Sequence, residues 1–221
     1  MYSISEVKSL LEKDSIESIE MLVELLNNSA NIEETFERWS EFSIDEKLKL
    51  CKVMEKVQSI PILAAKIAKA EDDLKVKASL VKILYKVGDE AVIEILAEFL
   101  KHPDRRIRAN AVEALGIMNS RKIKDLLMPY LEDPDNRVRA NTAVALWKFP
   151  EIREKVKQAF EEMLRNENKW MKASAFYAFG EIGIREFLEQ LVNDLYNSDE
   201  DLAKNAFLAL VSYSEKVEEE L

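Results

Sequence analysis

Apolar and polar residues follow a helical pattern across residues 60–213, and this pattern recurs about every thirty-one residues. The copies begin at Asp73, Asp104, Asp135, Asn168 and Asp199, which are 31, 31, 33 and 31 residues apart. In the second copy, apolar or small residues include Ile107, Ala111 and Leu115. Residues three or four positions apart share one face of an α-helix. Five copies in nearly constant register therefore predict a repeat architecture.

Each copy is predicted to form part of an antiparallel helix pair. The opening Asp or Asn is a favoured N-cap, because its side chain accepts hydrogen bonds from the first free backbone N–H groups. A further amphipathic helix is expected before each opening residue, at about 60–70, 89–101, 121–132, 150–165 and 184–197. Short polar turns join the two helices, and Pro103 and Pro134 stop the first helix in two of them. Such pairs stack into an α-solenoid, in which each pair buries one face against its neighbours.

The copy that begins at Asp104 reads Asp-x-x-Ile-Arg-x-x-Ala-x-x-Ala-Leu-Gly and ends at Gly116. This pattern resembles the HEAT repeat, in the short bacterial and archaeal form that is named after phycobilin lyases. The resemblance covers residues 59–213 as five repeats and implies an all-α, right-handed α-solenoid (an α-α superhelix). It is specific for the fold and says little about function.

The first 58 residues fit the repeat less well. Two capping-box patterns, Ser3 with Glu6 and Ser43 with Glu46, mark helix starts. We expect helices near 4–12, 15–28, 31–41 and 43–58, which form two degenerate pairs that cap the solenoid. A separate helical docking domain is the alternative, but no flexible linker precedes Pro61. Residues 214–221 are expected to form an acidic tail of one continuous solenoid.

A column of basic residues lies four positions after the cap residue in successive copies. It consists of Lys77, Arg108, Arg139 and Lys172. HEAT-like proteins often link such a ladder to the cap aspartate of an adjacent repeat. The resemblance thus implies a structural role for this column together with Asp73, Asp104 and Asp135.

A column of small amides and hydroxyls lies two positions further on and is expected to point to the inner, concave face. It consists of Ser79, Asn110, Asn141, Ser174 and Asn205, and the next turn adds Lys82, Glu113, Val144, Tyr177 and Leu208. In armadillo proteins, a related solenoid, an asparagine column holds the backbone of an extended peptide. Asn suits this role because its amide both donates and accepts hydrogen bonds. The alternative is a solvated helix face that tolerates small polar residues.

Two tryptophans interrupt the repeat pattern. Trp147 replaces the glycine found at Gly116 and Gly180, and we expect its ring to fill a gap at the repeat junction. Trp170 precedes an apolar core position at the start of its helix and is expected to be partly exposed.

The composition indicates an ordered chain, with 48% hydrophobic and 33% charged residues among 221. A single cysteine, Cys51, cannot form a disulfide within the chain, which favours a cytoplasmic location. The longest stretch without a charged side chain, 205–214, is too short to cross a membrane. One histidine and one cysteine also leave too few ligands for a metal cluster.

Charge is unevenly distributed, although the net charge is −10. Residues 101–150 carry ten basic and six acidic side chains, whereas 151–221 carry nine and sixteen. The basic segment is suited to an acidic protein segment, or it consists only of ordinary charged turns. The overall negative charge makes nucleic acid an unfavourable partner.

No arrangement of catalytic side chains follows from the spacing. His102 occupies an inter-helix turn, Cys51 lies on a predicted helix, and the four glycines form no phosphate-binding loop. We therefore expect a monomeric, non-enzymatic scaffold, without cofactor or metal, that binds a peptide or helix of another protein. The resemblance leaves two alternatives open, a bilin-lyase-like subunit and, with least support, a HEAT-like DNA glycosylase. The acidic end at residues 215–221 leaves a third, a regulatory domain of a larger signalling protein.

Overall fold

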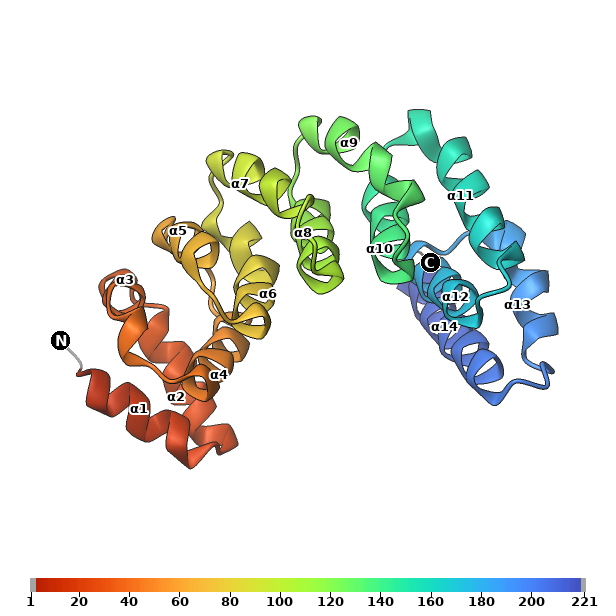
Figure 1. Cartoon of the computed structure of the whole chain (residues 1–221). Coiled ribbons are helices and arrows are strands. Elements are labelled where there is room, and N and C mark those ends of the chain that lie inside the picture. The colour runs from red at the N-terminus through yellow and green to blue at the C-terminus, as the bar shows by residue number, and fades with distance from the viewer. Residues whose placement is uncertain (1–2, 220–221) are drawn as a thin grey trace. The chain divides into compact units, whose positions relative to one another are not determined.

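The computed structural model describes residues 3–219, with side chains for 3–215, and contains only helices and turns within this range (Figure 1). The chain divides into two compact units, an N-terminal unit of residues 1–118 and a C-terminal unit of residues 119–221. Each unit is built from consecutive pairs of helices, as an α-solenoid requires.

The N-terminal unit contains eight α-helices within residues 3–118. They are α1 (Ile4–Lys13), α2 (Ile16–Leu26), α3 (Ser29–Glu37), α4 (Ile44–Met54), α5 (Leu63–Ala70), α6 (Leu74–Ile83), α7 (Ala91–Phe99) and α8 (Arg105–Ile117). The second helices of the pairs, α2, α4, α6 and α8, pack side by side in chain order. On the other side of this layer, α5 packs on α6 and α7 packs on α8 (Figure 1).

The C-terminal unit continues the same plan. Its α-helices are α9 (Lys122–Leu127), α10 (Asn136–Leu146), α11 (Arg153–Arg165), α12 (Lys169–Ile182), α13 (Leu188–Asp194) and α14 (Glu200–Glu219). The second helices α10, α12 and α14 pack in one layer, while α11 packs on α12 and α13 packs on α14. In both units, we call this row of second helices the second-helix layer.

The observed helices follow the predicted ones closely. Each first helix expected between residues 60 and 197 is present, in three cases partly as a 3₁₀ turn: Met128–Glu132, Pro150–Ile152 and Arg185–Phe187. The four N-terminal helices are also present, with α4 ending at Met54 rather than near residue 58. The predicted tail from residue 214 is helical up to Glu219, and residues 220–221 lie outside the described part. The predicted division at residue 58 stays a prediction.

Cap side chains explain where the second helices begin. Asp73, Asp104, Asp135 and Asn168 each accept hydrogen bonds from backbone N–H groups of the first turn that follows. Asp199 does the same for Asp201 and Leu202. These contacts satisfy donors that a helix start leaves unpaired, and they confirm the predicted caps.

Small residues allow the second helices to approach closely. Alanines such as Ala109, Ala111 and Ala143 are fully buried on this layer. Helices α12 and α14 approach closely, since a Cβ atom on Gly180 would lie 3.0 Å from the carbonyl oxygen of Ala209. Glycine at this position therefore sets the spacing of the two helices.

A buried polar cluster joins the segment after α3 to the turn before α6. The Trp39 indole Nε1 donates to the Glu71 carboxylate at 3.0 Å, and the Lys47 ammonium pairs with the same oxygen at 2.9 Å. Both charged side chains are largely buried. The cluster thus ties residues 39–47 of the predicted cap to the first predicted repeat.

Candidate partner-binding surfaces

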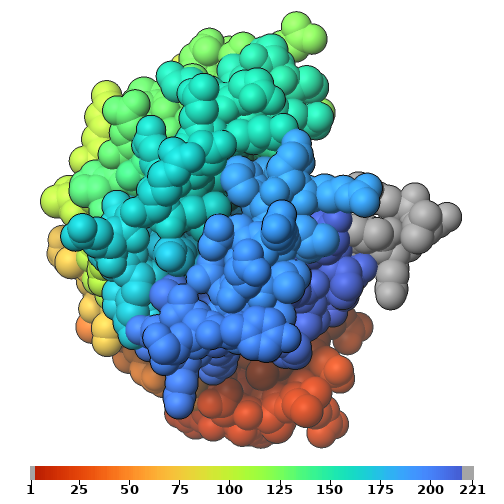
Figure 2. All heavy atoms as spheres, turned by 90° about the vertical axis from the view of Figure 1, so that its right-hand side faces the viewer, coloured from red at the N-terminus to blue at the C-terminus, as the bar shows by residue number. Residues whose placement is uncertain are grey.

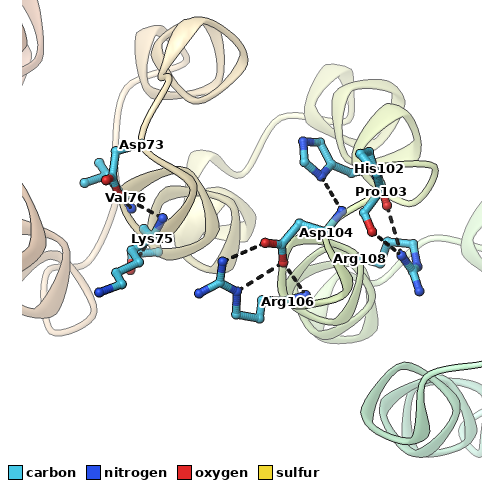
Figure 3. A network of polar contacts seen from close by, with 9 residues as sticks. Asp73, Lys75, Val76, His102, Pro103, Asp104, Arg106 and Arg108 are labelled. Atoms are coloured by element: carbon cyan, nitrogen blue, oxygen red, sulfur yellow. Dashed lines mark hydrogen bonds and ion pairs between the residues drawn. The ribbon is translucent and has the colours of Figure 1, made fainter.

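The basic ladder predicted from the sequence contacts several different partners. Figure 3 shows Arg108 donating from Nη1 to the backbone carbonyls of His102 at 3.1 Å and Pro103 at 3.0 Å. Arg139 donates to the Glu162 carboxylate on α11 at 3.1 Å. These contacts fasten second helices to a preceding turn or to a neighbouring first helix. The predicted link from this ladder, including Lys77 and Lys172, to an adjacent cap aspartate stays a prediction.

Asn110 departs from its predicted place in an exposed column. It is only 7% exposed, and its amide nitrogen donates to the backbone carbonyl of Ala78 on α6 at 2.8 Å. The amide therefore holds α8 against α6 and is not presented to a partner. The sequence pattern was wrong here, because it indicated the face of the helix but not how closely α6 approaches it.

The other members of that column are half-buried and form local hydrogen bonds. Ser79 donates to the carbonyl of Lys75 at 3.0 Å, and Asn205 donates to that of Asp201 at 2.7 Å. Ser174 accepts a hydrogen bond from the Asn136 amide at 2.6 Å, which ties α12 to α10. Asn141 is also engaged in an interaction. The polar groups of Ser79, Ser174 and Asn205 thus form hydrogen bonds within a helix or between neighbouring helices.

The column one turn later contains the exposed candidate. Lys82 pairs with Glu55 at 3.3 Å, and Glu113 and Val144 are half-buried. Tyr177, in contrast, is 53% exposed on α12. An exposed aromatic ring in the second-helix layer offers apolar area that a partner can cover.

Trp170 lies on the same face of α12 as Tyr177, two turns earlier, and is 51% exposed, as expected. The Lys169 ammonium lies 5.0 Å from the centre of its ring. Lys169 in turn pairs with Asp199 at 3.0 Å and Asp201 at 2.8 Å. The Lys169 ammonium, which two carboxylates hold in place, therefore restrains the indole ring from one side. We call Trp170, Ser174 and Tyr177 the α12 stripe.

Trp147, the other unusual tryptophan, is half-buried at the end of α10. The Arg153 guanidinium lies 5.0 Å from the centre of its ring and also donates to its backbone carbonyl at 3.1 Å. This packing against α11 matches the expected structural role.

A cavity of about 540 Å³ opens in the N-terminal unit between α1, α2 and α4. Its lining includes Leu10, Leu11, Ile19, Leu22, Leu48 and Cys51, together with Ser79 of the predicted column. The basic rim follows α4 and the residues after it. Lys49 pairs with Asp14 and Asp45, whereas Lys52 and Lys56 have no such partner among the described residues. An apolar floor beside two unpaired ammonium groups suits an apolar side chain with a neighbouring carboxylate.

Much of the predicted basic segment is locally neutralised. Arg106 forms two hydrogen bonds with the Asp104 carboxylate, the shorter at 2.6 Å (Figure 3), and Lys124 pairs with Glu151 at 2.9 Å. The Arg106 guanidinium and backbone N–H groups hold the pKa of Asp104 at about 2, so the pair stays ionised at neutral pH. Arg105, Lys122 and Arg137 also take part in interactions.

The single histidine and the single cysteine are both poorly suited to catalysis. His102 Nδ1 accepts a hydrogen bond from the Asp104 backbone N–H at 3.0 Å, and burial and the charges of Lys77 and Arg108 lower its pKa. Burial raises the pKa of the Cys51 thiol to about 12, so it is not a thiolate at neutral pH. No cluster of potential metal ligands occurs within residues 3–215, whose side chains the structure describes. No helix within residues 3–219 has the length and apolarity needed to cross a membrane.

Residues 60–147 match the family of HEAT repeats, which agrees with the helix pairs observed there. The chain therefore contains HEAT repeats within residues 60–147. No curated protein matches the chain.

Several solved structures resemble the chain over most of its length. An engineered protein is 17% identical, with 95% of this chain and 97% of that chain covered and a TM-score of 0.45. A designed armadillo repeat protein in complex with the peptide (KR)4 is 14% identical, with 95% and 98% covered and a TM-score of 0.43. The Escherichia coli protein YibA is 15% identical, with 96% and 93% covered and a TM-score of 0.42. Similarity at this level carries no functional information.

Proposed function

We propose that this protein is a non-enzymatic scaffold that binds a peptide or a helix of a partner protein. The observation that carries the proposal is the α12 stripe, where Trp170 and Tyr177 are both more than half exposed on one helix face. Aromatic side chains of this kind supply much of the binding energy in protein interfaces. The stripe lies in the second-helix layer, where the sequence pattern also placed the groove.

The stripe is already partly ordered before a partner arrives. Lys169, held by Asp199 and Asp201, restrains the Trp170 ring, and the Asn136 amide restrains Ser174. A surface that is ordered in advance loses less conformational entropy on binding. Val144 on α10 occupies the repeat position equivalent to Tyr177 and offers further apolar area beside it. We infer a partner segment that presents at least two apolar side chains to these helices.

The chemistry of the remaining candidates supports a binding role over catalysis. His102 Nδ1 accepts a hydrogen bond from the Asp104 backbone N–H, and the Cys51 thiol is protonated at neutral pH. We further propose that the protein acts without a cofactor and in the cytoplasm.

The test compares wild-type protein with a Trp170→Ala/Tyr177→Ala variant in affinity capture from nuclease-treated lysate of the source organism. A Val192→Ala/Tyr196→Ala variant is the matched control, since Val192 on α13 and Tyr196 in the turn after it are also exposed. We expect a partner that wild type and the control retain and the α12 variant loses. Purified partner should bind the α12 variant at least about tenfold more weakly.

Equal retention by all three proteins would contradict the α12 site. Loss of the partner only in a Lys52→Glu/Lys56→Glu variant would place the site at the N-terminal cavity instead. In every case, unchanged circular dichroism spectra and melting temperatures must show that the variants are folded.

A further inference from the structure

The last helix, α14, exposes an apolar face in the structure. Phe207 is 57% exposed, Leu208 52% and Val211 38%. They occupy adjacent turns on the side of α14 away from its buried residues Leu202 and Ala206. Figure 2 views the molecule from the side on which α13 and α14, in blue, reach the surface. Apolar patches of this kind commonly mark an interaction site.

The repeat position of Phe207 is buried in the earlier copies. Residues equivalent to Phe207 are Phe176, Ala143 and Val112, and all three are fully buried. Val211 is equivalent to Gly180, whose side-chain position points at the backbone of α14. The exposed face of α14 is thus the face on which a second helix of this fold receives its neighbour.

Charged residues flank this face in a self-complementary order. Lys204, Leu208, Val211 and Glu215 are spaced by four, three and four residues, which is the spacing of a helix–helix seam. Lys204 and Glu215 are exposed, and neither has an ion pair with another described residue. This spacing is the same in both directions along the helix. Reversing the order of the four positions therefore exchanges Lys204 with Glu215 and Leu208 with Val211.

We propose that this face binds the α14 helix of a second copy of the chain in antiparallel orientation. Lys204 of each copy then lies opposite Glu215 of the other, and Leu208 lies opposite Val211. Phe207 flanks the seam and adds apolar area. A parallel arrangement would instead place Lys204 opposite Lys204 and Glu215 opposite Glu215, which is repulsive. The resulting homodimer replaces the monomer expected from the sequence, and it does not depend on the α12 stripe.

The experiment measures the molar mass of the full chain by sedimentation velocity over a concentration series at about 0.15 M salt. Wild type should form a dimer. Lys204→Glu and Glu215→Lys each place like charges opposite one another at both ends of the seam. Each single variant should therefore raise the dimer dissociation constant at least about tenfold. The double variant Lys204→Glu/Glu215→Lys exchanges the charges and should restore the dimer.

A Lys66→Glu variant is the matched control, since Lys66 is an exposed lysine on α5, and it should dimerise like wild type. Leu208→Asp should give a monomer with an unchanged circular dichroism spectrum. A wild-type chain that remains monomeric at its highest soluble concentration would overturn the proposal. So would a dimer that both single charge variants leave intact, or single-variant defects that the double variant does not repair.

Discussion

At the scale of single residues, a hydrogen bond decides whether a polar side chain is structural or available. Asn110 and Asn205 occupy equivalent repeat positions, and the sequence predicts one role for both. Asn110 instead donates to Ala78 on the neighbouring helix, whereas Asn205 donates within its own helix. Ala78 is small and nearly buried itself, which lets the two helices come within reach of one amide. The substitution effects of these two asparagines should therefore differ.

We expect Asn110→Ala to lower the free energy of unfolding by about 1–3 kcal/mol, because a buried carbonyl loses its donor. Asn110→Asp should cost at least as much, since an ionised carboxylate cannot donate and would face the Ala78 oxygen in a buried site. Chemical denaturation measures both effects. Asn205→Ala is the control and should change stability by no more than about 0.5 kcal/mol. Equal effects at the two positions would contradict the assigned role of Asn110.

At the scale of helices, buried polar links and close backbone contacts join neighbouring elements. Glu71 joins Trp39 and Lys47 to the turn before α6. Burial alone would raise the pKa of Glu71, but the hydrogen bonds from Lys47 and Trp39 outweigh it and lower the pKa below its ordinary value. Glu71 therefore stabilises the fold in its ionised form. Its contribution is fully present above about pH 4.3, the ordinary pKa of glutamate, and is lost as the pH falls through the lower folded-state pKa.

The Glu71→Gln substitution tests this link. We expect a loss of about 1–3 kcal/mol at pH 7, because the largely buried Lys47 ammonium loses its counter-charge. The difference between wild type and variant should shrink when unfolding is measured below about pH 4, where the wild-type carboxylate becomes protonated. Glu55→Gln, which removes an exposed partner of Lys82, serves as the control and should have little effect at either pH. A difference that does not depend on pH would show that the charge of Glu71 is unimportant.

Gly180 tests the close contact between α12 and α14. In an isolated helix, Gly→Ala is favourable by about 1 kcal/mol. Here the added Cβ would lie 3.0 Å from the Ala209 carbonyl oxygen, so the helices must separate. We expect Gly180→Ala to destabilise the protein by about 1–3 kcal/mol in thermal or chemical unfolding. Gln158→Ala on the exposed side of α11 should be nearly neutral, and a stabilising effect of Gly180→Ala would refute the contact.

At the scale of the whole molecule, helix pairs in a repeat protein contact mainly their neighbours in the chain. A destabilising substitution in one helix pair should therefore affect mainly that pair and its immediate neighbours. In Gly180→Ala, we expect amide hydrogen exchange to become faster in α12 and α14 while exchange in α1 to α6 keeps its wild-type rate. Mass spectrometry of peptides from each helix measures this directly. Equal acceleration in both units would mean that the chain unfolds as one cooperative body.

The local features of this protein follow directly from its amino-acid sequence. Periodic apolar residues, cap residues and prolines act within one or two turns of chain, and the caps at Asp73, Asp104, Asp135 and Asn168 are where the pattern predicts them. The repeat period also predicted the helix pairs and the resemblance to HEAT repeats. The exposure of Trp170 could be predicted because it lies outside the buried stripe of its own helix.

Contacts between helices, in contrast, determine which outward-facing positions are buried. Asn110 is buried because α6 approaches within hydrogen-bonding distance, and Phe207 is exposed although its equivalents Phe176, Ala143 and Val112 are buried. The cavity beside Lys52 likewise depends on how α1 and α2 pack against α4. The physical reason is the same in each case. A sequence pattern specifies which face of a helix is apolar, whereas the distance to the next helix depends on side chains that lie about thirty residues away in the chain.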